Sequence, residues 1–350
     1  MSKINLSVIK TWFSSALISL ILSACASAPQ GEKAPDWLTG ASAAYPKSEY
    51  LVGVSYAADK NAAGIAAISE LVSVFGQKVT SATLASKRMV RAEIAGNAAT
   101  ASESSIDQSI LREVNQDDVI AVELPEFYEA KNEGKWYALA VMSREKGGQI
   151  YSSMIAKNQK EISAILEQYR ADKEPYTLVN FSRLDFAEEL AKNNEKYLKR
   201  LSVLTPKAAE SFSSISTPVQ IHKTKVELAE KIPVCVNVDD DSDGRIAKGF
   251  QEVMASFGFN TTVGSNERYV ISCKNHFSQS ASSNEKTKFC EYAAECALID
   301  TFVGETLVPL SVTGREGSTS YQNAEVRAKQ KIVSKVKEEF AKKFSDYLGK

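Results

Sequence analysis

The chain has 350 residues, with 42 basic and 43 acidic side chains and a formal net charge of −1. Because there is no basic excess, the composition argues against nucleic acid as a partner. Hydrophobic residues make up 44% of the sequence, which is enough for a sizeable core, and the length suits two domains of ordinary size.

The first 25 residues have the pattern of a secretion signal. Lys3 and Lys10 give a positively charged start, and an uncharged apolar stretch follows over 11–22. This stretch is shorter than the roughly 20 residues that a membrane-spanning helix needs. It also ends in small residues, as cleavable signals do. The sequence therefore predicts a signal peptide over 1–24.

The end of this signal, Leu22-Ser23-Ala24-Cys25, resembles a bacterial lipobox cleaved between Ala24 and Cys25. The resemblance implies a diacylglyceryl group on the Cys25 thiol and an acylated new amino terminus. Three acyl chains hold a protein on a membrane far more firmly than one. Residues 26 and 27 are alanine and serine, and neither is the aspartate that resembles an inner-membrane retention signal. This favours the outer membrane and a chain that faces the periplasm. The alternative is an ordinary signal peptide with a chance cysteine.

After the signal, small and polar residues over 25–34 predict a flexible tether. The first domain is predicted over 35–145. It begins with a strand from Tyr50 to Tyr56 and a helix from Asp59, supported by apolar residues at steps of three and four. A further strand is expected around Arg88–Ile94.

The clearest element of the first domain is a hairpin. Its strands are predicted over Val119–Ala130 and Lys135–Met142, because the turn Asn132-Glu133-Gly134 contains residues that accept a positive φ. A helical hairpin or linker is then predicted over 146–230. Glu174-Pro175 separates its two helices, and Pro206 and Pro218 lie in a serine-rich connection after the second.

The last domain is predicted over 231–350. Val234, Val236 and Val238 alternate along a strand, and a helix over 245–257, a strand over 268–274, and strands near 290–303 and 306–313 follow. A long helix closes the chain, with apolar residues at every fourth position from Ala324 to Leu348. Both domains therefore suggest a β-α-β-β-β-α order, and we predict an α+β fold with helices packed on mainly antiparallel sheets, joined by a helical arm.

Several short motifs of the first domain resemble the bacterial lipoprotein family called LPP20-like. They are Pro35-Asp36-Trp37, Tyr50-Leu51-Val52-Gly53-Val54, the alanine-rich helix from Ala62, Glu126-Phe127-Tyr128 and Gly134-Lys135-Trp136-Tyr137-Ala138-Leu139-Ala140. They span about 110 residues and follow the lipobox. The resemblance implies an outer-membrane lipoprotein without known catalytic residues, and some relatives belong to flagellar or surface assemblies. The last domain is outside this pattern.

Four cysteines remain beyond Cys25, and all lie in the last third: Cys235, Cys273, Cys290 and Cys296. In an oxidising periplasm an even number predicts disulfides, and we expect at least one within the last domain. Cys290–Cys296 is the favoured pair because the five residues between them can turn back. A Cys235–Cys273 bridge, a zinc site and buried free thiols are the alternatives. Zinc is disfavoured because no Cys-x-x-Cys occurs and His276 is the only nearby histidine.

Two further stretches suggest ligand sites. Asp239, Asp241 and Asp243 match the first half of a calcium loop, but Phe250 stands where the bidentate glutamate belongs. The alternative is a solvated turn with Asp243 at the start of a helix. The second stretch, Gly314–Ser318, precedes the final helix. Free backbone amides there, with Arg315, Gly317 and Ser318, would take an anion. An ordinary strand-to-helix turn is the alternative.

The sequence offers no catalytic set. Neither His222 nor His276 belongs to a metalloprotease motif or accompanies a Gly-x-Ser-x-Gly nucleophile, so we expect no catalytic residues, cofactor or resident metal. The leading hypothesis is a structural or interaction component of the cell envelope. Its partners would be membrane lipid, through the acylated N-terminus, and an envelope protein or a second copy. The alternatives are a binding module for a glycan, lipid or small anion in the last domain, and a cell-wall hydrolase.

Overall fold

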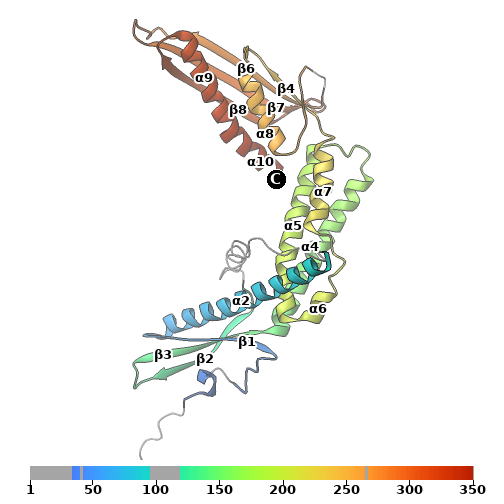
Figure 1. Cartoon of the computed structure of the whole chain (residues 1–350), viewed down its shortest axis with the longest axis vertical. Helices are drawn as coiled ribbons and strands as arrows, with labels where there is room; N and C mark the ends of the chain where they lie inside the picture. The colour runs from blue at the N-terminus through green and yellow to red at the C-terminus, as the bar shows by residue number, and fades with distance from the viewer. Residues whose placement is uncertain (1–33, 40–41, 95–118, 265–266, 350) are drawn as a thin grey trace, which may run out of the picture. The chain divides into compact units, whose positions relative to one another are not determined.

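A computed structural model describes residues 34–39, 42–94, 119–264 and 267–349. Ala24, Cys25 and the predicted signal peptide lie outside these residues. The chain divides into two compact units, Met1–Gly147 and Gly148–Lys350. The α+β class predicted from the sequence is confirmed, since each unit contains one sheet with helices packed against it (Figure 1).

The sheet of the first unit is fully antiparallel. Its strands β1 (Tyr50–Ala57), β2 (Val122–Ala130) and β3 (Lys135–Ser143) have the order β1-β3-β2. The predicted hairpin is confirmed as β2 and β3. Its turn includes Gly134 at φ +62°, a left-handed conformation that glycine adopts without steric cost.

Helix α2 (Lys60–Ile94) covers one face of this sheet. The Asp59 carboxylate caps it by accepting a hydrogen bond from the Ala62 amide at 2.8 Å. Gly53 on β1 lets the helix approach closely, because a Cβ there would lie 2.5 Å from the Leu71 nitrogen. Among the described residues, one stretch, Lys60–Thr83, is long and apolar enough to cross a membrane. It forms the part of α2 that packs on the sheet.

The strand expected around Arg88–Ile94 is wrong. These residues are the end of α2, and the segment is rich in Lys, Arg, Met, Ala and Glu, which all favour helix. The described part of the first unit therefore has the order β-α-β-β.

The face of the first sheet that α2 does not cover is covered by the segment that contains η1 (Asp36–Thr39). There the Trp37 ring, 1% exposed, packs on Leu139 and Val141.

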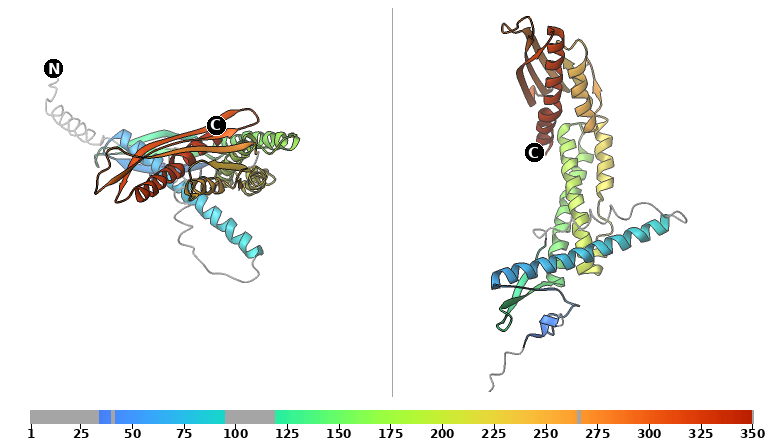
Figure 2. Two further views of the ribbon diagram at one scale, coloured as in Figure 1. Left: turned by 90° about the horizontal axis from the view of Figure 1, so that it is seen from above. Right: turned by 60° about the vertical axis from the view of Figure 1, so that its left-hand side comes forward.

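Four helices fill most of residues 144–229: α4 (Arg144–Ala171), α5 (Leu178–Leu204), α6 (Pro206–Glu210) and α7 (Pro218–Ala229). Pro206 and Pro218 each begin a helix, a position where the missing N–H costs nothing. Thr217 and Gln220 form a capping box at the start of α7. Helices α5 and α7 run side by side (Figure 2).

The second sheet has the order β5-β4-β6-β7-β8. Its strands are β4 (Val234–Val238), β5 (Thr261–Thr262), β6 (Tyr269–Gln279), β7 (Lys288–Asp300) and β8 (Glu305–Ser318). β4 pairs in parallel with β5 and β6, whereas β6, β7 and β8 pair antiparallel over much longer stretches. The sheet is thus mainly antiparallel, as predicted.

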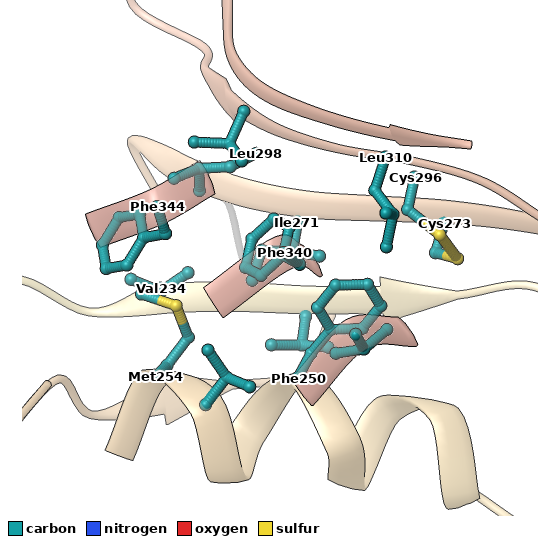
Figure 3. Close-up of a cluster of buried hydrophobic side chains, with 14 of the residues drawn as sticks. Val234, Phe250, Met254, Ile271, Cys273, Cys296, Leu298, Leu310, Phe340 and Phe344 are labelled. Carbon is teal, nitrogen blue, oxygen red and sulfur yellow. A yellow bond between two sulfur atoms is a disulfide. The ribbon is translucent and has the colours of Figure 1, made fainter. Parts of the chain in front are cut away.

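Helices α8 (Arg245–Ser256), α9 (Tyr321–Lys335) and α10 (Ala341–Leu348) bury one face of this sheet. Phe250 of α8 meets Phe340 edge to face, with ring centroids 5.0 Å apart (Figure 3). Phe181 of α5 contacts Phe259 in the same core, at 4.7 Å between ring centroids. The beginning of α5 and the last sheet therefore share one hydrophobic core.

The closing helix is interrupted by one π-helical segment, η3 (Val336–Phe340). All the apolar residues at every fourth position are buried: Ala324, Ala328, Ile332, Val336, Phe340, Phe344 and Leu348. In an α-helix, a spacing of four drifts about 40° around the axis at each step. A π turn holds more residues than an α turn. It therefore reduces this drift and keeps Phe344 and Leu348 on the core side.

Candidate functional site

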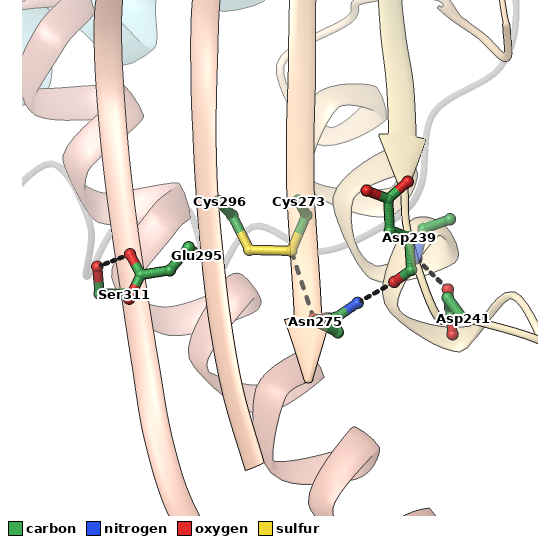
Figure 4. The surroundings of a disulfide bond; sticks show 8 residues. Asp239, Asp241, Cys273, Asn275, Glu295, Cys296 and Ser311 are labelled. Carbon is green, nitrogen blue, oxygen red and sulfur yellow. Dashed lines mark hydrogen bonds between the residues drawn. A yellow bond between two sulfur atoms is a disulfide. The ribbon is translucent and has the colours of Figure 1, made fainter. Parts of the chain in front are cut away.

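The disulfide joins Cys273 on β6 to Cys296 on β7, two residues that face each other across the strands (Figure 4). The predicted Cys290–Cys296 pair is wrong. Both residues lie on β7, where six extended residues span roughly 20 Å, far beyond the separation that a bridge allows. The predicted strand near 290–303 was already incompatible with this pair, because it places both cysteines on one extended segment. Cys235 and Cys290 are free and buried, and burial raises the pKa of the Cys290 thiol.

The acidic loop over 239–244 leads into helix α8, and basic side chains lie close to its carboxylates. The Asp241 carboxylate accepts a hydrogen bond from the Ala247 amide of α8 at 2.8 Å. Asp243 pairs with Arg245 at 2.7 Å and lies 3.8 Å from the Lys329 ammonium. Burial opposes ionisation of Asp243, but the Lys329 charge and the Arg245 hydrogen bonds outweigh it and lower the pKa of this carboxyl.

Lys329 is 3% exposed, so a lysine of α9 supplies positive charge close to this loop. The backbone carbonyl of Asp239 is also engaged, because it accepts a hydrogen bond from the Asn275 amide at 2.7 Å. Within the described ranges, no group of three or more His, Cys, Asp or Glu side chains is placed to hold a metal ion. The arrangement matches the alternative interpretation, a turn at the start of a helix.

The turn predicted over Gly314–Ser318 is wrong, because these residues belong to strand β8. Arg315 is the register partner of Glu291, and Gly317 is the partner of Phe289. Arg315 donates a hydrogen bond to Ser282 and lies over the Phe289 ring. The start of α9 lies beyond Ser318 and is capped by Ser320. The structure therefore does not bring Arg315, Gly317 and Ser318 together at a helix N-terminus.

A cleft in the second unit is a candidate site, and we name it the α5 cleft. It has a volume of about 600 Å³. One wall is the first three turns of α5, and the other is the end of α10. The lining residues are Leu178, Val179, Ser182, Arg183, Asp185, Phe186, Glu189, Tyr347, Leu348 and Gly349. Sequence reasoning missed this cleft because its walls are far apart in the chain.

The apolar part of the cleft combines buried and half-exposed side chains. Leu178 is fully buried and Leu348 is 4% exposed, whereas Val179 and Phe186 are 51% and 50% exposed. The Ser182 hydroxyl donates a hydrogen bond to the Leu348 carbonyl and so joins α5 to the end of α10. One signal was present in the sequence. Val179 and Phe186 stand seven residues apart, on one side of α5 and away from its core-facing residues.

The charged side chains of the cleft differ in their partners. Asp185 accepts from the Lys225 ammonium at 2.6 Å, and Glu189 accepts from Lys192 at 2.6 Å. Both carboxylates therefore have a lysine partner that is not part of the lining, and each of these lysines also contacts Glu188. Arg183 is exposed, and its guanidinium donates to the Asn180 side-chain oxygen at 3.3 Å.

A smaller hollow of about 330 Å³ lies between α5, α7 and the ends of α8 and α10. Asp185, His222 and Lys225 line it, and Glu188 lies beside them with 7% of its side chain exposed. Lys225, Lys192 and His222 contact the Glu188 carboxylate at 2.6, 3.0 and 3.2 Å. Burial alone would raise the pKa of Glu188. These three hydrogen bonds outweigh burial and lower it to about 2.

No protein-family model matches the sequence, and no curated protein is significantly similar to it. The secreted protein HP1454 from Helicobacter pylori has a similar structure, with a TM-score of 0.45 and 15% sequence identity. The match covers 85% of this chain and 98% of that one. A minor lipoprotein from Acinetobacter baumannii matches 33% of this chain and 91% of its own, with a TM-score of 0.25 and 10% identity. At these values the similarities do not establish a function, and the LPP20-like resemblance stays a prediction.

Proposed function

We propose that the chain is a lipid-anchored component of the cell envelope that faces the periplasm from the outer membrane and acts by binding rather than by catalysis. The lipobox that ends at Cys25 and the small, polar residues after it support the anchor. The α5 cleft supports the binding role, and it is the observation that carries the proposal.

The physical argument concerns the surface that the cleft leaves exposed. Val179 and Phe186 keep about half of their surface in water beside the buried Leu178 and Leu348. Burying a fully exposed apolar side chain of this size stabilises by about 1.5–3 kcal/mol, and covering the remaining half of each contributes about half as much. An occupant that covers both residues would therefore gain free energy without rearranging the core. Concave, largely apolar sites with a few polar groups are typical of ligand binding.

The anchor is tested by changing the cysteine that would be acylated. Cys25→Ser should abolish labelling of the protein by a fatty-acid analogue in cells and should leave the signal uncleaved by the lipoprotein peptidase. The matched control is Cys235→Ser, which leaves the lipobox intact and should keep the label. Unchanged labelling of the Cys25→Ser protein would refute the anchor.

The binding role is tested by a photoreactive amino acid at position 179 of the full-length protein in cells. Position 219 on α7 is the control, because Val219 is 78% exposed and does not line the cleft. We expect an adduct, either with a small molecule or with a protein, at position 179 and not at 219. Equal reaction at the two positions, or none at 179, would contradict a role for the cleft.

A further inference from the structure

The size of the α5 cleft limits what it can hold. Two half-exposed apolar side chains and a single hollow of about 600 Å³ are too little for a docked helix. A helix in a groove needs anchors at i, i+3, i+4 and i+7 along a longer strip. A stable protein interface covers about 800 Å² on each partner. The volume instead falls within the roughly 300–1,000 Å³ of small-molecule sites.

The distribution of charge identifies the polar end of such a molecule. The two carboxylates of the lining, Asp185 and Glu189, are each paired with a lysine at 2.6 Å, and both lysines are shared with Glu188. Arg183 makes no ion pair within 4.0 Å to any described residue. Its charge acts on Asp172, whose pKa is lowered first by a hydrogen bond from Asn180 and to a smaller extent by Arg183. The guanidinium therefore has donors left at the exposed rim of the cleft.

From these observations we propose that the α5 cleft binds a single-chain lipid anion, such as a free fatty acid. The acyl chain would lie against Val179, Phe186 and Leu348, and the carboxylate would meet Arg183. A planar guanidinium binds a carboxylate through two parallel hydrogen bonds, which a lysine cannot form. This inference rests on the proposed function, because it names the occupant of the same cleft.

The test uses the full-length protein and a twelve-carbon carboxylate that carries a diazirine, with the matching twelve-carbon alcohol as the neutral probe. After illumination, mass spectrometry locates the label. We expect the carboxylate to label peptides of α5 and α10 at least about tenfold more than the alcohol does, since hydrogen bonds to charged groups contribute on that scale. Equal labelling by the two probes would overturn the assignment of an anionic head group.

Variants and competitors sharpen this test. Arg183→Leu should lower carboxylate labelling by about tenfold, whereas Arg170→Leu, at an exposed arginine of α4 outside the cleft, should not change it. Val179→Trp should block labelling by filling the apolar part. Competing fatty acids should gain roughly tenfold in potency for every two added carbons until the cleft is full. Carboxylate labelling that is unchanged in both Arg183→Leu and Val179→Trp would overturn the inference.

The two proposals fail in different ways. If position 179 forms an adduct with an envelope protein while the diazirine carboxylate leaves α5 unlabelled, the binding role stands and the lipid anion is wrong. If position 179 forms no adduct and the carboxylate labels other parts of the chain, the cleft has no binding role and both proposals are wrong.

Discussion

The two sheets of this protein are buried in different ways. On β3, the central strand of the first sheet, residues 138–142 are buried without interruption, because α2 covers one face and the Trp37 segment covers the other. On β7 of the second sheet, buried and more exposed residues alternate from 290 to 300, because the helices cover one face only. A continuous buried run is typical of a sheet covered on both sides, and alternation is typical of a sheet with one solvated face.

This difference shows where each unit places its apolar surface. The first unit uses both faces of its sheet for its core. The second unit leaves one sheet face in water and extends its core along α5, whose Leu178, Phe181 and Leu184 pack with the sheet helices. The α5 cleft lies at the edge of this extension. The candidate binding surface thus arises from helix packing and not from the open face of the sheet.

The largest expected effect tests the cover on the first sheet. Trp37→Ala should lower the free energy of unfolding of the first unit by about 3–5 kcal/mol, as for other buried aromatic residues. It also removes a hydrogen bond to Glu126 at 2.7 Å. Urea unfolding followed by circular dichroism measures the loss. Trp136→Ala is the control, because Trp136 is only partly buried and should lose less. Equal losses would mean that the second face is not a core.

The second prediction concerns the bridge that reinforces the one-sided sheet. Replacing Cys273 and Cys296 with alanine opens a loop between residues separated by 23 positions. The free energy of unfolding should fall by about 3 kcal/mol. Of these four thiols, denatured protein purified without reductant should alkylate at Cys235 and Cys290 only. Alkylation of all four thiols would show that the bridge does not form in the protein.

Local patterns predicted most of the individual elements. The alternating valines at 234, 236 and 238 marked β4, and the turn before Lys135 marked the hairpin. The disulfide partner could not be read in this way, because it depends on the register between β6 and β7, which no short pattern states. The end of α2 was missed because Arg88–Ile94 was assigned to a strand despite its helix-favouring composition.

The candidate site was less predictable than the fold. Motif reasoning selected the acidic loop and Gly314–Ser318, where the structure shows a capped helix start and a strand. The cleft depends on how α5 meets α10, and its signal in the sequence was limited to Val179 and Phe186, two apolar residues on the side of α5 away from the core. A ligand site formed by common residue types on two helices that are far apart in the chain has no characteristic spacing in the sequence.

The third prediction tests the charges that join α5 to α7 in the second unit. Glu188 has a pKa of about 2 in the folded protein, below the ordinary value of 4.5. Its contribution to stability is therefore complete above pH 4.5 and is lost as the pH falls through about 2. Glu188→Gln should cost about 2 kcal/mol at pH 7, after allowance for the exposed partners His222 and Lys192.

Thermal unfolding between pH 2 and pH 7 measures this contribution. The stability of the Glu188→Gln protein should depend less on pH between pH 2 and 4.5 than that of the unchanged protein. Glu195→Gln is the matched control, because the Glu195 carboxylate is 55% exposed where it pairs with Lys199 and should change stability by less than about 0.5 kcal/mol. Parallel pH profiles for the unchanged and Glu188→Gln proteins would contradict the assignment.

The smallest expected effect lies on the open face of the second sheet. Glu295 is exposed on β7 and accepts a hydrogen bond from Ser311. Glu295→Ala should change the free energy of unfolding by no more than about 0.5 kcal/mol, as for most surface positions. Urea unfolding of the purified protein is the measurement. A loss of 2 kcal/mol or more, on the order of a core substitution, would show that this face is covered and would erase the contrast between the sheets.

The π-helical segment η3 makes the cleft depend on a count of residues. A π turn holds one residue more than an α turn, so deleting one residue from 336–340, for example Lys337, would restore a regular α-helix and leave Phe344, Tyr347 and Leu348 in place. Deleting one residue from the regular helix that follows, for example Lys342, would instead turn everything after it by about 100° around the axis. Phe344 would then leave the core, and Tyr347 and Leu348 would no longer form the wall opposite α5. The loss of a single codon at a solvent-facing position would thus remove the binding surface or leave it intact, depending on whether the deletion falls inside the π turn.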